Sequence, residues 1–127
     1  MIDALVGHLV GDYLLQNDWM AQGKKEHWFP CAIHVLVYAT CVMFCSGWIW
    51  AEAAPVIWVA VAVPHYLIDR WRFVQWYMRW FGQDIFMEPP MSPWSIIVVD
   101  NVFHIVCLWL TSKSVIVVTM IYLWLRA

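Results

Sequence analysis

Residues 31–50 read CAIHVLVYATCVMFCSGWIW, a run of twenty residues without a single Asp, Glu, Lys or Arg. A stretch of about 20 apolar residues is long enough to cross the hydrocarbon core of a bilayer as an α-helix. The rest of the chain has the same character, because 64% of its 127 residues are hydrophobic, 13% are charged and its mean hydropathy is +0.67. These values lie outside the range of ordinary soluble domains and predict an integral membrane protein.

Similar apolar stretches on both sides of this run set the expected architecture. Polar or proline-containing segments separate them, and the predicted spans cover residues 2–16, 31–50, 56–70 and 94–111. A chain of this length has room for about four spans and for no separate soluble domain. We therefore predict an all-α fold, a polytopic transmembrane bundle of about four helices that forms one domain over residues 1–127. Residues 115–125 are apolar again, and either continue the fourth helix or form a fifth short segment.

Basic residues gather on one side of this predicted bundle. The loops after the first and third spans contain Lys24, Lys25, Arg70, Arg72 and Arg79, whereas the opposite side has only Lys113. Lysine and arginine are enriched in cytoplasmic loops. The amino terminus is therefore expected outside.

Histidine and aspartate recur within the apolar stretches at a spacing of four residues, which places both on one helix face. There are three such pairs and one isolated histidine: His8 and Asp12, His65 and Asp69, Asp100 and His104, and His34. An ionised aspartate in the bilayer costs about 2.5–3.5 kcal/mol on insertion scales, so such residues usually mark a functional site. Counting about 1.5 Å per residue from the predicted span ends puts all seven in the cytoplasmic half of the bilayer.

A shared layer of imidazoles and carboxylates predicts a metal centre. Imidazole favours transition metals, so a divalent ion is expected, zinc first and manganese or iron as alternatives. Seven ligands suit two ions joined by a bridging aspartate, or one ion with some of the seven as outer partners. The structural alternative is that these residues form interhelical hydrogen bonds that hold the bundle together. Gly7 and Gly11 have the spacing of close helix packing, which we interpret as structural.

The chemistry expected of such a centre is hydrolysis of a lipid or lipid-linked ester or phosphoester that enters from the cytoplasmic leaflet. A metal-bound water is the nucleophile, and Asp12, Asp69 or Asp100 is its base. The predicted substrate-binding residues are Gln16, Lys24, Lys25, Arg70 and Arg72, of which the basic ones lie near the cytoplasmic surface and suit an anionic headgroup.

Two other functions use the same residues. The first is a metal-ion or proton transporter or channel, although the outer half of the spans offers little polar lining. The second is a non-catalytic membrane subunit. Membrane lipids, and a homo-oligomer or another membrane protein, are the expected partners; no nucleic acid is expected.

Several motifs resemble those of a known family. They are His8-Leu-Val-Gly-Asp12-Tyr-Leu-Leu-Gln16, then Asp18-Trp19-Met20-Ala21 with Lys24, then His34, His65-Tyr-Leu-Ile-Asp69 and Asp100-Asn-Val-Phe-His104. In this order the chain resembles the small membrane proteins of bacteria and their phages grouped as domain of unknown function 3307. The resemblance implies the bacterial inner membrane, with a phage-encoded origin as an alternative. The histidine and aspartate pattern also has a looser likeness to membrane-bound metal-dependent hydrolases.

Overall fold

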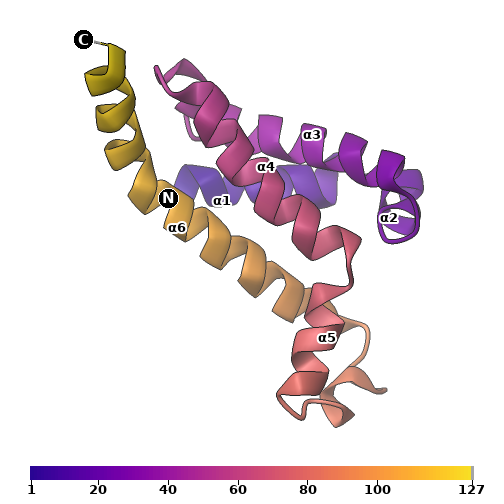
Figure 1. The fold of residues 1–127 in the computed structure, drawn as a ribbon. Helices are drawn as coiled ribbons and strands as arrows, with labels where there is room; N and C mark the ends of the chain where they lie inside the picture. Colours follow the sequence, from indigo (N-terminus) through magenta and orange to yellow (C-terminus); the bar gives the residue numbers. More distant parts are fainter. Residues whose placement is uncertain (127) are drawn as a thin grey trace.

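The computed structural model describes residues 1–126, and over these residues the chain is all α-helical, without a strand. The elements are α1 (Ile2–Leu9), the π-helical turn η1 (Val10–Leu14), α2 (Asp18–Gly23), α3 (Trp28–Cys45), the 3-10 turn η2 (Trp48–Trp50), α4 (Ala54–Arg70), α5 (Phe73–Trp80), the 3-10 turn η3 (Ile85–Met87) and α6 (Trp94–Arg126) (Figure 1). The predicted all-α fold class is confirmed.

Two of these helices are long and apolar enough to cross a membrane by length and composition, α3 and α6. The others are shorter, since α1 has 8 residues and α4 has 17. The described chain therefore contains two helices with the character of membrane spans. A bundle of four spans stays a prediction.

The second predicted span ends earlier than expected. Helix α3 stops at Cys45 instead of residue 50, because Gly47 adopts a left-handed conformation with φ 69°. Glycine tolerates this conformation without a steric penalty, and it commonly follows the last helical turn. The N–H groups of Ser46 and Gly47 then donate to the carbonyls of Val42 and Phe44.

Helix α6 is continuous over its 33 residues, so residues 115–125 continue the fourth helix. The polar residues in its middle keep the helical path because their hydroxyls donate to the preceding turn. Thr111 Oγ1 lies 3.0 Å from the Cys107 carbonyl oxygen, and Ser114 Oγ lies 2.9 Å from that of Leu110. Such bonds satisfy the hydroxyl within its own helix.

Helix α1 packs closely along α3, while α4 packs on α3 and α6 (Figure 1). A Cβ atom on Gly7 would lie 2.6 Å from the Cα of Val42, and one on Gly11 would lie 2.9 Å from the Cα of Tyr38. Only glycine allows this approach of the two backbones. The structural role predicted for the two glycines is confirmed.

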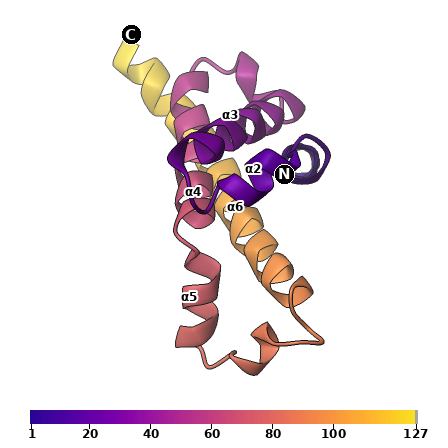
Figure 2. The same ribbon diagram turned by 90° about the vertical axis from the view of Figure 1, so that its right-hand side faces the viewer.

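Helix α5 projects away from α1 and α3 (Figure 2), whereas α2 packs on α3. Helix α5 was not predicted from the sequence, although its apolar core-facing residues recur every four positions. Val74 and Met78 are buried, whereas Trp76 and Trp80 are exposed. This pattern is typical of an amphipathic helix.

Candidate metal centre

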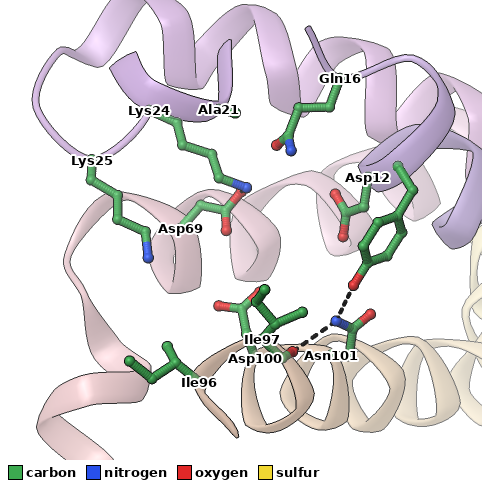
Figure 3. Close-up of a pocket in the computed structure, with 11 residues that line it drawn as sticks. Asp12, Gln16, Ala21, Lys24, Lys25, Asp69, Ile96, Ile97, Asp100 and Asn101 are labelled. Carbon is green, nitrogen blue, oxygen red and sulfur yellow. Dashed lines mark hydrogen bonds and ion pairs between the residues drawn. The ribbon is translucent and has the colours of Figure 1, made fainter. Parts of the chain in front are cut away.

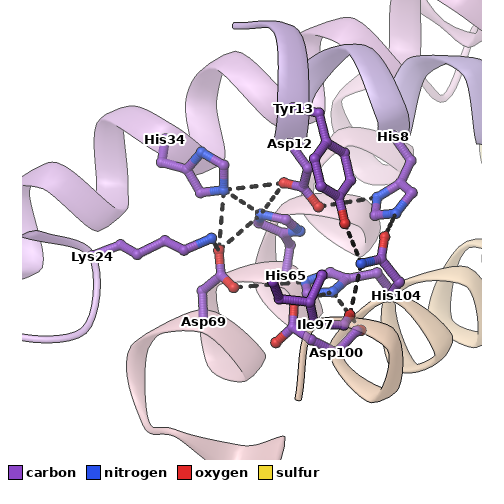
Figure 4. A network of polar contacts seen from close by, with 11 residues as sticks. His8, Asp12, Tyr13, Lys24, His34, His65, Asp69, Ile97, Asp100 and His104 are labelled. Carbon is purple, nitrogen blue, oxygen red and sulfur yellow. Dashed lines mark hydrogen bonds and ion pairs between the residues drawn. The ribbon is translucent and has the colours of Figure 1, made fainter. Parts of the chain in front are cut away.

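Four segments bring the seven predicted ligands into one connected network (Figure 4). The network joins His8 and Asp12 at the α1–η1 junction, His34 on α3, His65 and Asp69 on α4, and Asp100 and His104 on α6. The four histidines and Asp69 are at most 1% exposed, and Asp12 is 9% exposed. Asp100 is more accessible, with 21% of its side chain exposed.

Asp12 lies in the π-helical turn. The N–H of Leu15 donates to the carbonyl of Val10 at 3.0 Å, five residues back. Such widened turns are rare and often occur at functional sites. Asp12 Oδ1 lies 3.2 Å from His34 Nε2 and 3.5 Å from His65 Nε2.

Asp69 is at the centre of the network. Its Oδ2 lies 3.1 Å from His34 Nε2 and 3.2 Å from His65 Nε2, and these two nitrogens are 2.9 Å apart. Its Oδ1 lies 3.9 Å from His104 Nε2. Several lone-pair donors therefore face a common space.

Four of these atoms have no hydrogen-bond partner of acceptable geometry, namely Asp12 Oδ1, Asp69 Oδ1, Asp69 Oδ2 and His104 Nε2, and of the four Asp69 Oδ2 has the Lys24 ammonium beside it at 2.9 Å. An unsatisfied buried polar group costs about 1–3 kcal/mol. A further cation in the shared space would satisfy the other three. In the described part of the chain, three overlapping sets have ligand atoms within 4.8 Å of one another: Asp12, His65 and His104; His34, His65 and Asp69; and Asp69, Asp100 and His104.

His8 belongs to none of these sets, because both of its ring nitrogens face protein partners. Its Nδ1 lies 3.2 Å from Asp12 Oδ2, and its Nε2 donates to Asn101 Oδ1 at 2.9 Å. His8 therefore orients Asp12. His104 Nδ1 donates to the Asp100 carbonyl at 2.8 Å, which turns its Nε2 towards Asp69. Outer partners of this kind fix the ring orientation of metal-binding histidines.

Sequence reasoning missed two residues of the site. The Tyr38 ring stacks on His65 with a centroid distance of 3.5 Å and lies nearly perpendicular to the ring of His8. Asn101 also donates through Nδ2 to the Tyr13 hydroxyl and to the Ile97 carbonyl, which orients its Oδ1 towards His8. The same spacing rule could have found Tyr38, which lies four residues after His34.

A pocket of about 340 Å³ leads from the surface to this network (Figure 3). Its lining consists of Asp12, Tyr13, Gln16, Ala21, Lys24, Lys25, Asp69, Ile96, Ile97, Asp100 and Asn101. Three of the predicted substrate-binding residues are among them, namely Gln16, Lys24 and Lys25.

The other two predicted substrate-binding residues, Arg70 and Arg72, do not line the pocket. Arg70 instead holds the turn between α2 and α3, since its guanidinium donates to the carbonyls of Lys25 at 2.8 Å and Glu26 at 3.4 Å. Arg72 precedes the first turn of α5.

Lys24 extends from the end of α2 into the network. Its Nζ lies 2.9 Å from Asp69 Oδ2. Burial lowers the pKa of Lys24, but the negative charges of Asp69 and Asp12 outweigh this effect and raise the pKa above its ordinary value. A group with a raised pKa keeps its proton until the pH exceeds that pKa, so the ion pair persists at neutral pH.

Residues 1–126 match the sequence model of the family described as protein of unknown function, DUF3307. The chain belongs to this family. The match covers all the motifs on which the resemblance rested, and that prediction is confirmed. No curated protein and no solved structure matches the chain. The likeness of this DUF3307 chain to membrane-bound hydrolases stays a prediction.

On the side away from the pocket, the network of this DUF3307 chain is closed by apolar packing. Ala4, Val42, Val61 and Leu108 are buried at 4% exposure or less and belong to one hydrophobic cluster. Each lies four residues along its helix from His8, Tyr38, His65 or His104. A small cavity of about 10 Å³ lies on this side, lined by His65, His104, Leu108 and Thr111 among others, so the wide opening of the site is the pocket where α2 lies.

Replacing Asn101 tests the outer partners of the network. Asn101→Ala removes the acceptor of His8 and is expected to weaken metal binding by about 10- to 100-fold, the range seen for outer partners of metal ligands. Competition with a chelating dye measures the affinity. Asn101→Asp keeps an acceptor oxygen opposite His8, so we expect a smaller loss of metal affinity for this variant. Equal affinity for Asn101→Ala and the unsubstituted protein would contradict the role assigned to Asn101.

Proposed function

We propose that this protein is a membrane-embedded metal-dependent hydrolase that acts on a lipid or lipid-linked ester or phosphoester from the cytoplasmic leaflet. The observation that carries the proposal is the pocket in which Asp12, Asp69 and Asp100 lead to buried histidine and carboxylate atoms without hydrogen-bond partners. Such a combination of an open polar approach and a closed ligand cluster is typical of a catalytic metal site.

The proposed metal is zinc, with manganese or iron as alternatives, because the ligands are imidazoles and carboxylates. A bound metal supplies an activated water and polarises the scissile bond. Among the three proposed bases, Asp100 is best placed, since it lines the pocket and is the most accessible of the three carboxylates. The backbone carbonyl and the carboxylate of Asp100 both face Nδ1 of His104. Asp100 therefore orients the proposed metal ligand His104 and also lines the pocket.

The proposed substrate class follows from the walls of the pocket. Lys24 and Lys25 provide ammonium groups, and Ile96 and Ile97 provide an apolar wall. An anionic headgroup attached to an acyl chain matches both surfaces.

A location in the membrane is supported by the outer surface of the helices. Large apolar side chains are exposed on each of α1, α3, α4 and α6, among them Val6, Leu36, Val59, Val63, Val102 and Val106. A soluble monomer rarely exposes so extensive an apolar surface. We propose that these helices are four spans of a bundle in the bacterial inner membrane, with the amino terminus outside.

The closed packing beyond the site favours a hydrolase over a transporter. Beyond His65 and His104 lies a cavity of about 10 Å³ next to Leu108 and Thr111, far smaller than the pocket of about 340 Å³ on the α2 side. A transporter needs access from both sides in turn.

Chelation of the purified protein tests the proposal. We expect detergent-purified protein to cleave members of a panel of fluorogenic lipid esters and phosphoesters, to lose this turnover after treatment with EDTA, and to regain it with zinc.

The substitution Asp100→Asn tests the proposed base and is expected to reduce turnover by about 100-fold, as for the loss of a general base. Asp3→Asn, at an exposed site on α1, serves as the matched control. Turnover that EDTA does not affect would contradict the metal mechanism. Zinc uptake into proteoliposomes without turnover would favour the transporter.

A further inference from the structure

We infer that Lys24 provides one of the positive charges at this centre, so that the centre holds a single divalent ion beside the Lys24 ammonium instead of two ions. This inference rests on the metal centre proposed above. It gives the Lys24 ammonium a role in the centre itself, in addition to the substrate-binding role proposed above.

The position of the ammonium carries the inference. Lys24 Nζ lies 2.9 Å from Asp69 Oδ2, and the Lys24 side chain is only 12% exposed (Figure 4). The same carboxylate oxygen faces Nε2 of His34 and Nε2 of His65. Because Oδ2 is the Asp69 oxygen that faces both imidazoles, a metal ion held by His34, His65 and Asp69 would share this oxygen with the ammonium and lie next to its positive charge.

The fold holds the backbone of Lys24 in place. Asn17 caps α2 through its Oδ1, which accepts from the N–H of Met20 at 2.9 Å. A Cβ atom on Gly23 would lie 2.8 Å from the side chain of Pro30, so α2 ends in close contact with α3. Arg70 then binds the carbonyls of the next two residues. Lys24 therefore projects from a turn that is fixed on both sides, unlike a free surface lysine.

Charge balance supports one ion. Asp12, Asp69 and Asp100 contribute three negative charges to the pocket. Of the two lysines that line the pocket, only Lys24 forms an ion pair with one of these carboxylates; one divalent ion and this ammonium neutralise the three charges, whereas two divalent ions and the ammonium leave an excess of two positive charges. An uncompensated buried charge is costly. The set of Asp12, His65 and His104 makes no ion pair with Lys24, so it remains available to the single ion, and Asp69 Oδ1, which lies 3.9 Å from His104 Nε2, is its fourth ligand in this proposal.

Metal stoichiometry tests the inference. We would titrate EDTA-stripped protein with zinc and count bound ions by native mass spectrometry for the unsubstituted protein, Lys24→Met and Lys25→Met. Methionine keeps an apolar stem and removes the charge. Lys25 is the matched control, because it lines the same pocket and makes no ion pair with any described residue.

We expect about one zinc for the unsubstituted protein and for Lys25→Met, and about two for Lys24→Met, since two-metal sites form where a second position is open. Two ions in the unsubstituted protein would overturn the inference, and would do so even if Lys24→Met failed to fold. A folded Lys24→Met that still binds a single ion would also overturn it. If none of the three proteins binds zinc, the proposed metal centre itself fails, which is a different result from either of these.

Discussion

Asp69→Asn is expected to abolish turnover and to remove the bound metal, while the protein still inserts and folds. Asp69 contacts more members of the network than any other carboxylate, since its two oxygens face His34, His65, His104 and Lys24. An amide in the same place has one oxygen and no charge, so it loses one ligand atom and leaves Lys24 without its counterion. We expect a loss of at least about 100-fold in turnover, because removal of a metal ligand exceeds the effect of removing an outer partner.

The measurement combines elemental analysis with the chelator-sensitive hydrolysis assay. Size-exclusion chromatography and circular dichroism in the same detergent establish that the variant is folded. Asp3→Asn, which replaces an exposed carboxylate of α1 by an amide, is the control for the same replacement outside the network. Full turnover together with full metal content in Asp69→Asn would show that this carboxylate is not part of the centre.

Gly7→Ala is expected to destabilise the bundle. The added Cβ would lie 2.6 Å from the Cα of Val42 and 2.8 Å from the carbonyl oxygen of Cys41, and both are backbone atoms that cannot rotate away. Helices α1 and α3 must therefore separate, which also moves Asp12 away from His34. Overpacking of this kind costs about 1–3 kcal/mol.

The sign of the change makes this prediction diagnostic. In an unconstrained helix, replacing glycine by alanine raises helix stability by about 1 kcal/mol. Thermal unfolding in detergent, followed by circular dichroism, therefore gives opposite results for close packing and for a free helix face. Val6→Ala, on the same helix at a site that is 48% exposed, is the control for a small change at the surface. A Gly7→Ala protein as stable as the parent, or more stable, would contradict the close contact between α1 and α3.

Much of the candidate site could be predicted because its residues follow a local rule. His65 and Asp69 lie one helical turn apart, so any helix through them places both on one face. The same rule applies to His8 with Asp12, where the turn is π-helical, and to Asp100 with His104. Antiparallel helices with short connections then bring these faces to a common depth. The four-residue spacing in the sequence therefore predicts which side chains share a helix face, and no more of the fold than this.

Other features depend on contacts between residues far apart in the chain, for which the sequence has no local pattern. The bond between His8 and Asn101 joins residues 93 positions apart. Arg70 was predicted to bind substrate from its charge alone, whereas in the fold it binds two backbone carbonyls 44 and 45 residues away. The π-helical turn at Asp12 was equally hidden, because it differs from an α-helix by a single register shift in the backbone.

Elemental analysis of protein purified without chelators determines whether the histidine and aspartate network holds a metal ion. The comparison is between the unsubstituted protein and a variant with both His65→Ala and Asp69→Ala, two residues that contact each other and take part in all three ligand sets between them. We expect about one equivalent of zinc, manganese or iron in the unsubstituted protein and none in the variant. A folded protein without stoichiometric metal, or equal metal in both samples, would contradict this expectation.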